Sequence, residues 1–238
     1  MLDFVDMVSM ARYLFAPNTL PLANLLMRSN KKALETMFSF QGMQIGADIN
    51  QFQLIAGMGD VNGVVIQQLV IDTVSINLTV VGDHADLSNS YEVLRKFLTE
   101  IDSKRRMENP KLYTTTYQTQ SAVKLSVPYE RLIAPEFMNF LRSKTDILKP
   151  DDSSAAEIYL SNLSFQVRYI PNTDLYSLVP KMLTIEPRTG SDPKENMYYV
   201  LTPTDSNTHR QLVEEFEKTM SGVRCLPEEK LSDITHAQ

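Results

Sequence analysis

Residues 64–80 read VVIQQLVIDTVSINLTV, and their alternation of apolar and polar side chains decides the fold class. A strand that alternates in this way is buried on one face and wet on the other, which is typical of an antiparallel sheet. We therefore predict one long strand here, in an α+β fold whose largely antiparallel sheet carries helices on one face. The expected buried face comprises Val64, Ile66, Val70, Val74, Ile76, Leu78 and Val80, opposite Thr73, Ser75, Asn77 and Thr79.

The neighbouring segments predict further strands and helices. Glycines between residues 57 and 63 predict a hairpin that joins a strand over 51–58 to the long strand. Apolar residues at helical spacing and capping residues at the ends predict helices, the first of them capped by Ser88 or Ser90. The remaining strands are expected over 111–127, 159–169, 182–185 and 197–201, and the helices over about 90–106, 135–143 and 206–222.

The N-terminal segment is predicted to be helical. Residues 2–15 place Phe4, Val8, Ala11 and Phe15 on one helical stripe, and Pro17 ends that run. A second helix is expected over 22–38. We therefore divide the chain into an N-terminal helical segment (1–44), an α+β domain (45–225) and a polar tail (226–238). No internal sequence repeat relates residues 63–127 to 155–222.

Composition limits the possible partners. The net charge of −6 argues against nucleic acid as a main partner, because phosphate binding needs clustered cations. Arg12 and Pro17 interrupt the apolar N-terminal run, so we expect no membrane span. The single cysteine, Cys225, predicts neither a disulfide nor a zinc site and fits a reducing, cytoplasmic location. We expect no cofactor, because the phosphate-binding loop motifs are absent.

Asp83, His84 and Asp86 form the most suggestive polar cluster, at the end of the long predicted strand. Acidic and imidazole ligands at this spacing are a candidate metal site, and His84 is a candidate acid–base group. The alternative is a turn in which an aspartate caps the next helix.

His209 and the pair Arg168 and Tyr169 are the other candidate site residues. His209 stands in the first turn of the last predicted helix, beside several hydroxyl residues, and is the second candidate catalytic group; the alternative is an ordinary capped helix start. Arg168 and Tyr169 belong to a strand and are candidates for ligand binding, although exposure to solvent is the usual state of an arginine.

Functional residue types are sparse in this chain, so we favour a non-enzymatic binding or assembly module. Half of the methionines lie in residues 1–44, and methionine suits adaptable contact surfaces, so self-association or a protein partner is expected through that segment. Two alternatives stay open: a hydrolase-like enzyme with its site at strand ends, and a carrier of a small apolar ligand in a cavity between sheet and helices.

Overall fold

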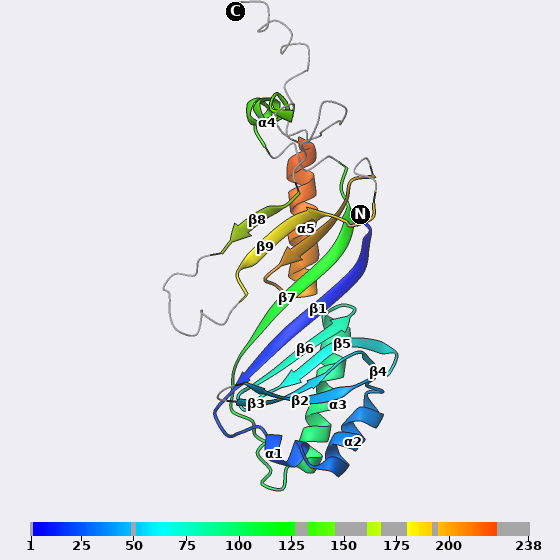
Figure 1. The fold of residues 1–238 in the computed structure, drawn as a ribbon, viewed down its shortest axis with the longest axis vertical. Helices are drawn as coiled ribbons and strands as arrows, with labels where there is room; N and C mark the ends of the chain where they lie inside the picture. The colour runs from blue at the N-terminus through cyan, green and yellow to red at the C-terminus, as the bar shows by residue number, and fades with distance from the viewer. Residues whose placement is uncertain are drawn as a thin grey trace, which may run out of the picture.

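The computed structural model describes residues 2–48, 51–126, 133–145, 161–167, 180–191 and 195–222. A ten-stranded antiparallel sheet runs through the molecule (Figure 1). Its strands are β1 (Phe4–Phe15), β2 (Met43–Asp48), β3 (Gln51–Ala56), β4 (Gly59–Val61), β5 (Val64–Ile71), β6 (Ser75–Val81), β7 (Leu112–Lys124), β8 (Leu163–Gln166), β9 (Met182–Pro187) and β10 (Met197–Thr202). The helices are α1 (Leu22–Leu25), α2 (Arg28–Met37), α3 (His84–Ile101), α4 (Pro135–Arg142) and α5 (Ser206–Gly222). The predicted α+β class is confirmed.

The helix predicted over residues 2–15 is wrong, because this segment is β1, a strand in the middle of the sheet. Strand order is β2-β3-β5-β6-β1-β7-β10-β9-β8, with β4 paired to β5. Met7, Ser9, Ala11 and Tyr13 are buried, whereas the residues between them are half-buried, which is the two-residue period of a strand. Apolar residues are so frequent here that both periods fit the sequence, and pairing with β6 and β7 decides between them.

The single long strand predicted over 64–80 is two strands joined by a turn. The Asp72 carboxylate accepts hydrogen bonds from the backbone N–H groups of Val74 (2.7 Å) and Ser75 (2.6 Å), which folds the chain back on itself. A register shift between Ile66 and Gln68 then turns Leu69, rather than Val70, toward the core. The single helix predicted over 22–38 is instead two short helices, α1 and α2.

Helices cover one face of the sheet, as predicted. The larger core cluster joins β1, β3, β5 and β6 to α1, α2 and α3, and its centre includes Leu78 and Leu94, both fully buried. A smaller cluster joins β7, β9 and β10 to α5 through Val123, Val200 and Val213. The helices α3 and α5 both lie behind the sheet in Figure 1.

The topology repeats itself around the β1–β7 pair. In each half a long central strand pairs with the strand that immediately precedes a long helix: β1 pairs with β6 before α3, and β7 pairs with β10 before α5. An aspartate at the start of each helix accepts from the backbone N–H groups two and three residues on, Asp83 in α3 and Asp205 in α5. Within the described residues, the same strand order and helix capping therefore occur in residues 4–101 and again in 112–222. The boundaries compared in the sequence do not coincide with these two units.

Loss of the α3 cap should lower the free energy of unfolding. Asp83 and Asp86 form a reciprocal capping box in which each carboxylate accepts from the backbone of the other residue. We expect Asp83→Ala to cost about 1 kcal/mol, measured by urea unfolding. Asp83→Asn, which keeps the accepting oxygen, should cost much less; equal losses in the two variants would contradict this role.

Candidate functional site

The two histidines predicted as site residues lie near the start of α3 and α5, on the helix side of the sheet. The backbone N–H of His84 donates to the Ser206 hydroxyl (2.8 Å), so the two helix starts are in direct contact. The His84 ring meets Tyr117 edge-on, with 5.0 Å between ring centroids, and its Nδ1 is buried with no hydrogen-bond partner in the described ranges. His84 and His209 therefore occupy the junction between the two repeated halves.

His209 is fully buried in a chain of hydroxyl groups. Its Nε2 lies 2.7 Å from the Ser121 hydroxyl on β7, and its Nδ1 lies 2.9 Å from the Thr202 hydroxyl on β10. The Thr202 hydroxyl continues to that of Thr204 (2.8 Å). Sequence reasoning found His209 and its hydroxyl neighbour Thr204, but Ser121 lies 88 residues away and only the folded sheet brings it there.

This serine–histidine pair is closed to substrate. Ser121 and His209 are both 0% exposed, so a reacting group cannot reach either side chain. Burial, and to a lesser degree the positive charge of Arg210, lowers the pKa of His209 to about 4. A neutral imidazole that bridges two strands and a helix holds α5 on the sheet, which is a structural role rather than a catalytic one.

The depressed pKa makes stability depend on pH. Between pH 6.5 and 4 the unfolded chain binds a proton at residue 209 that the folded chain excludes, so the free energy of unfolding falls as pH falls through this range. His209 contributes at most roughly 3 kcal/mol to this fall in the free energy of unfolding. Urea unfolding at several pH values should give a smaller slope for His209→Gln than for the wild type.

Val213→Ala, which weakens the packing of α5 on the sheet without removing a titratable group, is the control and should keep the wild-type slope between pH 6.5 and 4. A His209→Gln variant whose stability falls with pH as steeply as that of the wild type would show that His209 is not the group responsible.

Asp83 and Asp86, the candidate metal ligands, are occupied by the capping box of α3. The capping interpretation of Asp83 is confirmed, and the cap is this residue rather than Ser88 or Ser90. Within the described ranges, no three His, Cys, Asp or Glu side chains gather closely enough to hold a metal ion. Arg168 and Tyr169 lie outside the described residues.

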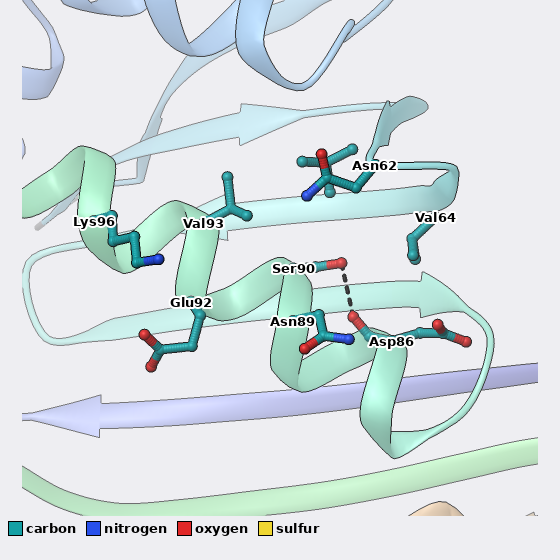
Figure 2. Close-up of a pocket in the computed structure, with 9 residues that line it drawn as sticks. Asn62, Val64, Asp86, Asn89, Ser90, Glu92, Val93 and Lys96 are labelled. Carbon is teal, nitrogen blue, oxygen red and sulfur yellow. Dashed lines mark hydrogen bonds between the residues drawn. The ribbon is translucent and has the colours of Figure 1, made fainter.

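A surface groove of about 360 Å³ lies between α3 and the turn that joins β4 to β5 (Figure 2). Asn62 and Gly63 form the turn, both with positive φ (53° and 81°), and Asp86 and Ser90 line the α3 side. The Ser90 hydroxyl is already bonded to the Asp86 carbonyl (2.8 Å). No lining side chain is a buried polar group without a partner among the described residues, so nothing marks the groove as a ligand site.

The face of the sheet opposite these helices presents three rows of side chains. Residues directly paired on neighbouring strands project to the same face, so each row can be followed from strand to strand. We call these rows together the open face. The first row is Val65, Val81, Val8, Gln120, Leu201, Thr184 and Ser164; the second is Gln68, Thr79, Met10 and Gln118; the third is Gln44, Ile55, Val70, Asn77, Arg12 and Thr116.

Charge is nearly absent from the open face. The first row crosses seven strands and both repeated halves without a charged residue, and the aliphatic Val65 and Val81 in it are 37% and 39% exposed. Arg12 is the only charged residue in the three rows. Beyond the first row, toward the other end of these strands, the charged residues include Lys124, Glu186 and the ion pair of Asp6 with Arg188 (2.7 Å).

Arg12 and Thr116 carry polar atoms that the chain leaves unsatisfied. They are direct partners on β1 and β7. Arg12 Nε and the Thr116 hydroxyl oxygen are both buried, and neither has a hydrogen-bond partner among the described residues. Such groups are rare because each costs about 1–3 kcal/mol when left unpaired. Two of them side by side mark the centre of the open face as incomplete.

Sequence reasoning missed this surface because it placed residues 2–15 in a helix. Met10 and Arg12 were then assigned to an appendage instead of the centre of the sheet. The sequence feature that points to the open face is the polar side of the segment 64–80, because Asn77 and Thr79 lie on that face. The central strand between them and β7 could not be inferred from that signal.

No protein-family model matches the chain, and no curated protein matches it either. None of the helices in the described ranges is both long enough and apolar enough to cross a membrane. The function is therefore argued from the geometry of the chain's own residues.

Proposed function

We propose that the protein is a non-enzymatic binding or assembly module that holds a polypeptide on the open face of its sheet. The observation that carries the proposal is the uncharged first row, which crosses seven strands and both halves of the molecule. Protein surfaces exposed to water are normally rich in charge, whereas the centres of protein–protein interfaces are depleted of it.

The size of the open face suits a protein partner. Strands are spaced about 4.8 Å apart and alternate residues of a strand about 6.7 Å apart, so the three rows span roughly 30 Å by 20 Å, or about 600 Å². A typical specific interface buries about 800 Å² on each partner, which is of the same order. Glutamine, threonine and asparagine side chains supply hydrogen bonds, and valine, leucine and methionine supply apolar contact.

The chemistry-bearing residues support binding over catalysis. His209 and Ser121 are buried in the fold, and Asp83 and Asp86 cap a helix. The Met-rich segment 1–44 contributes through β1, whose Val8, Met10 and Arg12 stand in the middle of the three rows.

Site-specific photo-cross-linking in cells tests the proposal. A benzophenone amino acid at Gln118 or Gln68 should give one discrete product with the same polypeptide, a second copy of the chain included. Val81→Glu should reduce the yield about tenfold, because a central charge opposes burial.

The matched controls are Asn89 and Glu100, both exposed on α3, where the same probe should give no such product. Equal products from both sides of the sheet, or none from Gln118 and Gln68, would contradict a binding role for the open face.

A further inference from the structure

The centre of the open face lacks a hydrogen-bond acceptor for Arg12 and Thr116 among the described residues. On the premise that this face binds a polypeptide, we propose that the partner is a different protein that places the carboxylate of an Asp or Glu side chain against Arg12 and Thr116. This inference rests on the proposed function and specifies the chemistry of the partner.

The two donors at the centre of the open face, on Arg12 and Thr116, can both be satisfied by one acceptor group that has two oxygens. In the described part of the chain, Arg12 Nε–H has no acceptor, and the Thr116 hydroxyl, on the neighbouring strand, has no partner either. Directly paired residues have Cβ atoms about 5 Å apart, which is within the reach of a single carboxylate. Neighbouring side chains enclose both atoms in the free protein, so the carboxylate meets them only when these side chains turn aside. A guanidinium binds a carboxylate with two parallel hydrogen bonds, and a hydroxyl can donate to the same group.

Carboxylate is favoured over phosphate because the surroundings are neutral. A nucleic-acid backbone needs several cations, and Arg12 is the only one in the three rows. A partner seated on this face buries Arg12 away from water. A lone buried cation is costly unless an opposite charge meets it, so the partner must bring one negative charge to this point.

The position of Arg12 points to a side-chain carboxylate rather than the end of a chain. Four further strands of the path lie on one side of β1 and four on the other, so Arg12 stands in the middle of the sheet. A partner that covers the first row must continue in both directions past Arg12. A chain terminus bound there would leave half of the face empty.

A second copy of this chain is a poor source of that carboxylate. Two copies packed centre to centre would bring the two Arg12 side chains together among uncharged residues, and like charges in a dry interface oppose binding. The acids close to the rows already have partners: Asp72 accepts from the backbone N–H groups of Val74 and Ser75. Asp6 on β1 pairs with Arg188 (2.7 Å), and Glu186 on β9 accepts from Asn162 (3.4 Å).

The test uses the full chain and two blocked peptides, acetyl-Thr-Val-Glu-Val-Thr-amide and the same peptide with Gln in place of Glu. Titrations are followed by NMR at the Arg12 Nε–Hε signal and at the backbone signals of Met10 and Gln118. We expect the Glu peptide to shift the Arg12 signal saturably and to bind at least tenfold more tightly than the Gln peptide. Arg12→Gln should abolish the difference between the peptides.

The matched control is Lys124→Gln, which removes the exposed cation beyond the first row and should preserve the difference between the peptides. Arg12→Lys, which keeps the charge without the planar fork, should bind the Glu peptide more weakly than the wild type and more tightly than Arg12→Gln. Thermal unfolding of each variant shows whether it is folded.

Three results would overturn the inference. Equal binding of the two peptides, with shifts at Met10 and Gln118, would show that the open face binds polypeptide without an acidic anchor, and the proposed function would stand. The absence of any shift at Arg12 would show that it is no anchor. A shift of the Arg12 signal with protein concentration alone, together with a doubled mass in solution, would identify the partner as a second copy.

Discussion

The antiparallel pairing of β1 with β7 is the interaction on which the rest of the structure depends. It joins the two repeated halves into one sheet, with Ala11 opposite Tyr117 on the helix side and Arg12 opposite Thr116 on the other. Because β1 is also paired to β6, its backbone is bonded on both sides and it cannot be an edge. The cross-sheet rows are continuous only because this pairing sets their register.

Because the helices cover only one face of the sheet, the two faces of the sheet have different roles. On one side, Leu78, Leu94 and their neighbours form the larger core, and the bridge from Ser121 through His209 to Thr202 ties α5 to two strands. Most polar groups on that side are bonded within the fold, although His84 Nδ1 and Glu217 Oε2 have no partner among the described residues. On the other side the strands present neutral polar and aliphatic side chains around Arg12, whose Nε has no hydrogen-bond partner. What distinguishes the face without these helices is that its two unpartnered groups, Arg12 and Thr116, are direct partners on neighbouring strands.

The sequence predicts the local elements well and the central ones poorly. Turn and capping residues locate α3, α5 and the β4–β5 turn, because those signals act over a few residues. The segment 2–15 fits two periods, and only pairing with strands about 70 and 110 residues away selects the strand. The site residues were missed for the same reason. Contacts between distant segments place Arg12 at the centre of the sheet and bring Ser121 to His209, and no local sequence pattern predicts such contacts. The Asp72 turn was missed because the alternation of apolar residues continues across it.

The central claim is that one face of this sheet is open in the free protein, and NMR with a neutral gadolinium chelate in solution measures this directly. Methyl signals of Val8, Met10 and Val81 should be broadened strongly by the chelate. Those of Ala11 and Leu78, which lie on the same two strands but face the helices, should be protected. Equal protection of both sets would contradict the account, because it would show that the face proposed for a partner is already covered by the chain itself.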